Sequence, residues 1–378
     1  MVERGSWSRV GARWRLPSAV LLALALAGCD AVEFYWQGVA GQLDLVARAQ
    51  PIAEVVATTG DDALRARLRR LQAIRAYASS ELALPDNRSY TRYTDVGRPF
   101  VVWNVFAAPP LSLVARQWCF PVAGCVAYRG YFAEADARAE AQRLAAAGDD
   151  VHVSGVPAYS TLGWFDDPAL STFVGWREVD LARLLFHELA HQVVYVRDDT
   201  SFNESFATAV EEEGLRRWLA AQGARPDAAA LAADAERGSA LRAEFRVLIR
   251  RTRERLREVY GSALPDADKQ REKTAALAAL HRDYAALKQR WGGLPAFDRW
   301  FANGANNAGL VAATLYSDRV PAFAALIAQE GGDLRRFYAR VQALAALPRA
   351  ERDAALALDA ASAGGENAAP SPDRAARR

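Results

Sequence analysis

Apolar residues recur at helical spacing along most of the chain. Leu64, Leu68 and Leu71, for example, repeat every three or four positions, and arginines occupy the opposite face. The ranges with this pattern are 31–85, 134–147, 180–196, 202–219, 227–291 and about 322–329. Within 227–291, two apolar stripes on either side of a turn at 261–268 predict a long helical hairpin.

Strand patterns are fewer and shorter. Stretches rich in valine and aromatic residues lie at 100–106, 126–132 and 151–159. The last two flank the helical range 134–147, which gives strand–helix–strand order ahead of residue 180. A few short strands among many helices predict an α+β fold with a small mixed sheet and a mainly helical remainder.

Turn residues suggest where the chain divides. Pro85-Asp86-Asn87 interrupts the first helical range, so we expect an N-terminal helical segment over 29–85 and one larger domain over 86–350. From about residue 360 the chain consists mainly of Ala, Gly, Pro, Ser and charged residues, which predicts a disordered tail over 360–378.

Composition and charge narrow the class of protein. The 378 residues are 51% hydrophobic and 24% charged, as in folded globular proteins. The net charge is only +2, and most basic residues lie beside acids in predicted helices, so we expect no nucleic-acid partner. The arginines between Arg246 and Arg257 are most simply the solvated side of the predicted hairpin.

The N-terminus has the order of a secretory signal. Four arginines between Arg4 and Arg15 precede an apolar run over 20–27, which is too short to span a bilayer. Leu26-Ala27-Gly28-Cys29 resembles the lipobox of bacterial lipoproteins. The alternatives are an ordinary signal peptide with a chance cysteine, or a buried helix.

The lipobox resemblance implies removal of residues 1–28 and lipidation of Cys29. Several acyl chains on one residue anchor a protein firmly. The mature protein would therefore lie at the periplasmic face of a bacterial membrane, and Asp30 after the cysteine favours the inner membrane.

Two further cysteines lie six residues apart, at Cys119 and Cys125. Pro121 and Gly124 between them allow the chain to turn, and export would place it in a compartment that permits disulfides. We therefore predict a Cys119–Cys125 disulfide. A metal site on these sulfurs is less favoured, because no other His or Cys lies nearby.

His187-Glu188-Leu189-Ala190-His191 is the central motif. On a helix the two histidines are one turn apart on one face, so both imidazoles can hold the same zinc ion. Glu188 lies beside them and can accept a proton from water activated by the zinc, as a general base. A chance match is the alternative, but histidine is rare in this chain, with 4 residues in all.

A catalytic zinc usually has three protein ligands. Glu204, in Asn203-Glu204-Ser205-Phe206-Ala207, is the candidate third ligand, because a returning helix would bring it opposite the histidines. The alternative is a carboxylate that interacts with the helix dipole. Thr208 and Glu211 share the helix face of Glu204 and are candidates for orienting a ligand imidazole.

These paired motifs resemble those of the gluzincins, which include thermolysin and the large aminopeptidases. The gap between His191 and Glu204 is shorter here than in those enzymes. The wider pattern is similar to a family of predicted bacterial lipoprotein aminopeptidases. The segments that carry this resemblance are the lipobox, 34–37, 119–132, 159–165, both metal motifs and 306–323.

The resemblance implies a zincin-like catalytic domain that holds one zinc ion and cleaves peptides or proteins. In such domains an edge strand before the active helix pairs with substrate backbone, and Ala158–Trp164 lies at that place in the sequence. The alternative is an ordinary sheet strand. The residues expected to bind substrate are Tyr159, Ser160, Thr161, Leu162 and Gly163.

A zinc peptidase also needs a donor for the oxyanion that forms on the peptide carbonyl. Tyr316 is the candidate, because gluzincins often place a Tyr or His after the second helix. A packed core tyrosine is the alternative, and Tyr195 is a weaker candidate.

Two function classes follow from these motifs. The first is a zinc peptidase, named an aminopeptidase by resemblance alone. The second is a regulatory or protein-binding module that contains zinc and hydrolyses little. A structural zinc site has no use for Glu188, which favours the first. A serine hydrolase is not indicated, because no Gly-x-Ser-x-Gly motif is present.

Overall fold

The computed structural model describes residues 34–120, 124–158, 160–314 and 319–366. It divides into two compact units, Met1–Asp44 and Leu45–Arg378. In the first unit the described residues, from 34 onward, are helical. The predicted signal segment, Cys29 and Asp30 lie outside the described residues. Of the helices that the structure describes, none combines the length and apolar character needed to cross a membrane.

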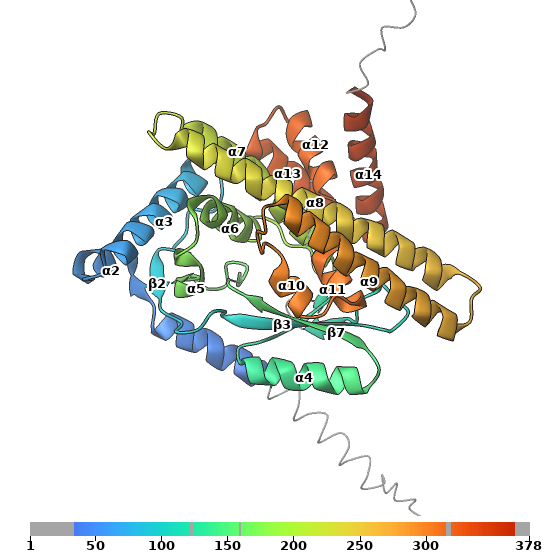
Figure 1. Ribbon diagram of the computed structural model, residues 1–378. Helices are drawn as coiled ribbons and strands as arrows, with labels where there is room; N and C mark the ends of the chain where they lie inside the picture. Colours follow the sequence, from blue (N-terminus) through green and yellow to red (C-terminus); the bar gives the residue numbers. More distant parts are fainter. Residues whose placement is uncertain (1–33, 121–123, 159, 315–318, 367–378) are drawn as a thin grey trace, which may run out of the picture. The chain divides into compact units, whose positions relative to one another are not determined.

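The second unit consists mainly of helices (Figure 1). Asp61, Asp199 and Asp333 begin three of them by accepting hydrogen bonds from backbone N–H groups of the first turn. The helices are α2 (Ile52–Thr58), α3 (Asp62–Ser80), α4 (Glu134–Ala146), α5 (Ser171–Val174), α6 (Glu178–Ala190), α7 (Thr200–Ala221), α8 (Ala228–Gly261), α9 (Asp266–Arg290), α10 (Asp298–Ala302), α11 (Asn307–Thr314), α12 (Val320–Gln329), α13 (Leu334–Ala345) and α14 (Arg349–Glu366).

Three small sheets complete the unit. Their strand orders are β1-β2-β8, β6-β3-β7 and β4-β5. The first is mixed, because β2 pairs antiparallel with β1 and parallel with β8. The strands are β1 (Gln50–Pro51), β2 (Arg92–Thr94), β3 (Val102–Ala108), β4 (Trp118–Phe120), β5 (Gly124–Val126), β6 (Arg129–Tyr131), β7 (Asp150–Val156) and β8 (Ala169–Leu170).

The sheet β6-β3-β7 lies between helices. Strand β3 is buried along its whole length and pairs antiparallel with β7, from Val102 opposite Val156 to Ala108 opposite Asp150. Both strands contact α4 and α11, which lie on opposite sides of the sheet in Figure 1. Strand β7 is left at the edge of this sheet.

The helices α6 and α7 form the centre of the main core. They pack closely on each other, and α3 covers another side of α6. Phe186 of α6 and Phe206 of α7 are fully buried in this core, and Phe206 also stacks on Phe337 of α13. The apolar stripes that predicted these helices are therefore the surfaces through which they pack.

The helices α8 and α9 correspond to the hairpin expected at about 227–291 (Figure 1). They enclose a second core, in which Phe245 stacks on Phe297 and Tyr284 stacks on Phe301. This core is separate from the one around α6 and α7.

Two expectations about domain limits differ from the structure. The border expected at residue 85 does not divide two cores, because α3 packs into the core that also contains α6 and α7. The predicted disordered tail begins too early, since α14 continues to Glu366. Alanine, which is abundant there, has the highest helix propensity. Residues 367–378 lie outside the described part of the chain. The fold is thus α+β and mainly helical, with small sheets.

Candidate metal centre

The last turn of α6 carries the two histidines. His187 lies inside the helix and His191 is its C-terminal cap, so the rings are one turn apart with their centroids 4.8 Å from each other. Their Nε2 atoms are 3.2 Å apart. Both rings are almost fully buried. The helical spacing therefore brings two nitrogen ligands to one point.

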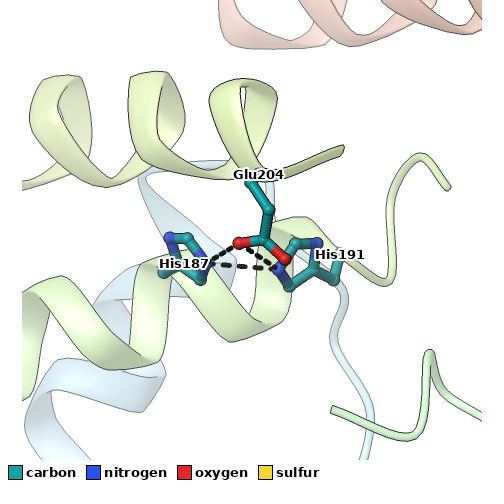
Figure 2. A group of neighbouring side chains, drawn as sticks. All are labelled: His187, His191 and Glu204. Atoms are coloured by element: carbon teal, nitrogen blue, oxygen red, sulfur yellow. Dashed lines mark hydrogen bonds and ion pairs between the residues drawn. The ribbon is translucent and has the colours of Figure 1, made fainter. Parts of the chain in front are cut away.

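Glu204 approaches this point from the first turns of α7 (Figure 2). Its Oε2 atom lies 3.3 Å from Nε2 of His187 and 3.8 Å from Nε2 of His191. Among the described residues, this trio is the group of His, Cys, Asp and Glu side chains whose ligand atoms could hold a metal ion.

Two observations show that the trio fits a metal ion. Oε2 of Glu204 is buried and receives no hydrogen bond from a described residue, which is costly for a carboxylate unless another charge compensates it. Zinc bonds of about 2.0–2.2 Å would place tetrahedral ligand atoms roughly 3.3–3.6 Å apart, close to the separations found here. Two nitrogens and one carboxylate oxygen are also a donor set that zinc favours.

Glu211 orients one of the imidazoles. It lies two turns beyond Glu204 on α7, and its Oε2 is 3.1 Å from Nδ1 of His187. Nδ1 can then donate its proton to Glu211, which leaves the Nε2 lone pair for the ion. Arg183 holds the other Glu211 oxygen at 2.5 Å. Thr208 is buried on the same helix.

Burial and nearby charge act differently on the two histidines. Burial tends to lower the pKa of His187, but the carboxylates of Glu204 and Glu211 outweigh it and raise that pKa well above its usual value. Burial lowers the pKa of His191 to about 4, with its Nδ1 buried and without a hydrogen-bond partner among the described residues. His191 is thus held neutral, which is the form that binds metal.

Glu188 borders a cavity of about 740 Å³ together with His187 and Glu211. The end of β7 and the residues after it, Val156, Pro157 and Ala158, also line this cavity. Burial raises the pKa of the Glu188 carboxyl to about 7, and the nearby Glu204 and Asp167 add to the rise. A carboxyl group with a pKa near neutrality is suited to exchange protons with a reacting group in this cavity.

The loop between α6 and α7 is fixed by Asn203, which precedes the candidate ligand Glu204. The Asn203 amide accepts a hydrogen bond from the N–H of Val196 at 2.7 Å and donates one to its carbonyl at 2.8 Å. The Asn-Glu pair of the motif therefore combines a residue that fixes the loop with a candidate metal ligand.

The Cys119–Cys125 hairpin packs against the same loop. The two sulfurs are bonded, and the cysteines face each other across β4 and β5. The N–H of Cys125 donates a hydrogen bond to Asp198 at 2.5 Å. Gly124 has a φ of +75°, and a Cβ there would lie 2.4 Å from Arg197. Glycine is therefore required where the hairpin meets the loop.

Tyr128 and Asp167 are site residues that the sequence did not indicate. Burial raises the pKa of Tyr128, and the carboxylates of Glu204 and Glu188 add to the rise. Asp167 is buried and accepts hydrogen bonds from Thr161. Burial raises its pKa to about 6. No local motif marks either residue, because chain segments distant from the histidines supply them.

The expected substrate strand over Ala158–Trp164 is wrong for the described residues. Pro157 follows β7, and Leu162 and Gly163 have φ values of +57° and +81°, which make a turn. Asp167 holds this turn through Thr161, while Ser160 accepts a hydrogen bond from the N–H of Leu162. The edge strand beside the cavity is β7, which ends at Val156.

Further histidine and asparagine residues make structural contacts away from the candidate metal centre. His152 is a core histidine 3.3 Å from the carbonyl of Gly304. The side-chain amides of Asn306 and Asn307 donate to backbone carbonyls around β3 and β7. Tyr159 and Tyr316, named for substrate and oxyanion binding, lie outside the described residues.

The family of the chain follows from a comparison with known families. A family model described as "Putative aminopeptidase" matches residues 33–356. The chain belongs to this family. The match covers both metal motifs and the whole described part of the second unit up to Leu356, and the family's name supports a peptidase-like function. No curated protein and no solved structure matches the chain.

Proposed function

We propose that this protein is a zinc-dependent peptidase of the gluzincin type, with a zincin-like catalytic domain and aminopeptidase activity. The observation that carries the proposal is the buried trio of His187, His191 and Glu204, next to a carboxyl group that is not needed as a ligand. The aminopeptidase family supports the reaction class. A purely structural metal site would not explain Glu188 or the cavity beside it.

In the proposed reaction, the zinc ion and the protein side chains have separate roles. Zinc held by the trio would acidify a water molecule and polarise the peptide carbonyl. The Glu188 carboxylate takes the proton of the attacking water and then delivers it to the nitrogen of the leaving amine. Glu211 keeps His187 in the tautomer that can bind the ion.

We also propose residues that bind the substrate backbone and the oxyanion. Backbone pairing of an extended peptide fits the free edge of β7 near Val156, with the turn at Thr161–Gly163 at its end. For the oxyanion we propose Tyr316, and we add Tyr128 because burial and the carboxylates of Glu204 and Glu188 raise the pKa of its hydroxyl.

The decisive experiment measures zinc and peptide cleavage on the same preparation. Purified protein is analysed for metal, then incubated with peptides that have a free or an acetylated N-terminus. One zinc per chain and cleavage of free peptides alone are expected for an aminopeptidase. Cleavage of both sets would indicate an endopeptidase. Bound zinc without cleavage of any peptide would favour the regulatory module.

The location of the protein is a separate proposal. We propose that Cys29 is lipidated after removal of residues 1–28 and tethers the catalytic unit to the periplasmic face of a bacterial membrane. Radiolabelled palmitate should enter the wild-type protein and not the Cys29→Ala variant. Fractionation of the two membranes would test the expectation of an inner-membrane position from Asp30.

A further inference from the structure

The helix that begins the described part of the chain, over residues 34–47, exposes four large apolar side chains. Tyr35, Trp36, Val39 and Leu43 are between 44% and 69% exposed. Each residue turns an α-helix by about 100°, so these four side chains lie within an arc of about 100°. We name this set the apolar face.

The apolar face differs from the remaining described surface. Elsewhere, exposed large apolar residues occur singly or as one adjacent pair, at Val114, Trp164, Phe165, Val247, Leu264 and Leu294. Scattered apolar residues are normal on a protein surface, whereas a contiguous group indicates an interaction site. Charged residues make up 24% of the chain, but Asp44 is the single charged residue within 34–44, and it lies outside the arc. The apolar face therefore suits an apolar partner rather than a charged one.

The position of the apolar face in the chain indicates what that partner is. Cys29, the residue proposed to carry the lipid, is five residues before Phe34, and five residues span at most about 18 Å. A lipid on Cys29 would therefore hold the start of this helix close to the bilayer. Trp and Tyr are enriched where membrane meets water, because each ring joins an apolar body to a polar N–H or O–H group. A helix over 34–47 is shorter than the roughly 20 residues that cross a bilayer, so it would lie along the surface.

We propose that the apolar face binds the interface of a lipid bilayer, as a second membrane contact beside the lipid on Cys29. The proposal is independent of the peptidase function and uses the proposed lipidation only to identify the partner. A lipid tether raises the effective concentration of the helix at the bilayer, so each contact strengthens the other. Because the apolar face carries no charge, its attraction to the membrane is hydrophobic and does not depend on the charge of the lipid headgroups.

Flotation with lipid vesicles tests the proposal without the lipid anchor. The chain from residue 29 onward, with Cys29→Ser to prevent lipidation, is mixed with phosphatidylcholine or phosphatidylglycerol vesicles. It should bind both kinds to a similar extent, in low and in high salt. Val39→Gln with Leu43→Gln should lower the bound fraction at limiting lipid by about tenfold, because two apolar side chains no longer leave water. Val114→Gln with Leu264→Gln is the matched control, since it removes one exposed Val and one exposed Leu from the second unit.

Fluorescence quenching shows whether the apolar face itself enters the membrane. Lipids with brominated acyl chains quench a tryptophan only where its ring reaches the acyl chains. Quenching should be seen in the protein with all 10 of its tryptophans and should largely disappear in Trp36→Phe, which keeps an aromatic ring and therefore still binds. Trp164→Phe is the control, because Trp164 is 72% exposed but belongs to the second unit. Equal quenching in Trp36→Phe and in the unsubstituted protein would overturn the proposal.

The other results of the flotation experiment have equally definite meanings. Absence of binding to either kind of vesicle would overturn the proposal, as would binding to phosphatidylglycerol alone that is lost in high salt. A dimer in sedimentation that Val39→Gln with Leu43→Gln dissociates, without vesicle binding, would instead make the apolar face a contact between two copies of the chain. Vesicle binding in a protein that incorporates no palmitate would support the apolar face and reject lipidation of Cys29. Cleavage of peptides and zinc content bear on neither result.

Discussion

Glu211 and His187 are 24 residues apart in the chain, yet the Oε2 atom of one lies 3.1 Å from the Nδ1 atom of the other. Arg183, one turn before His187 on the same helix, holds the second oxygen of Glu211. The carboxylate is thus fixed from both sides, and it fixes the ring in turn. Orientation of a metal-binding imidazole by a carboxylate is a general feature of zinc sites.

Glu211→Gln should weaken zinc binding by about tenfold to a hundredfold, the usual effect of losing such a partner. The amide can still accept from Nδ1 but brings no negative charge. Competition with a chromogenic chelator measures the affinity. Glu212→Gln is the matched control, because Glu212 is the next residue, is partly exposed and lies 3.9–4.0 Å from its arginine partners. Equal affinities in wild type and Glu211→Gln would show that Glu211 does not orient the ligand.

Glu188→Gln should keep zinc and lose peptide cleavage by about a hundredfold or more, the scale of a lost general base. Glutamine has nearly the same size and cannot take a proton from water. Metal content and kcat measured on one preparation decide the matter. Unchanged turnover with equal zinc would show that Glu188 is not the base. Loss of zinc together with activity would instead make it a ligand.

Asp167 should make the stability of the protein depend on pH. Burial raises the pKa of its carboxyl to about 6 in the folded protein from an ordinary value of 3.8, so the protonated form is favoured in the folded state. The contribution of this carboxyl to the free energy of unfolding is full below pH 3.8 and is lost as the pH rises through 6. The difference in unfolding free energy between Asp167→Asn and wild type should therefore shift by about 2–3 kcal/mol in favour of the variant when the pH is raised from 4 to 7. Urea unfolding at both pH values measures this, and a constant difference would contradict it.

Asp199 and Arg352 form a buried ion pair at the start of α7, with an N–O distance of 2.7 Å. Arg352→Met should lower the free energy of unfolding by about 3–5 kcal/mol, because it leaves the Asp199 carboxylate buried with a weaker partner, Arg319 at 3.3 Å. Asp353→Asn is the control, since that carboxylate is 40% exposed. Thermal and urea unfolding should separate the two variants, and similar values would argue against the buried pair as a stabilising contact.

The sequence alone determined the parts of this protein that depend on short-range periodicity. Helical spacing placed His187 and His191 on one face, and the apolar stripes located α6, α7 and the hairpin of α8 and α9. The cysteine pair was also predictable, because six residues with a turn between them allow the sulfurs to meet. In each case the geometry of one or two turns of chain is sufficient.

Only the tertiary structure decided which distant side chains surround the metal centre. The packing of α7 on α6 sets the 3.3 Å separation of Glu204 from His187 and brings Glu211 within 3.1 Å of the same ring. The turn at Leu162 and Gly163 replaced the expected strand, because their positive φ values and the buried Asp167 outweigh a strand-like sequence. Such contacts join residues far apart in the chain, so packing rather than local pattern determines them.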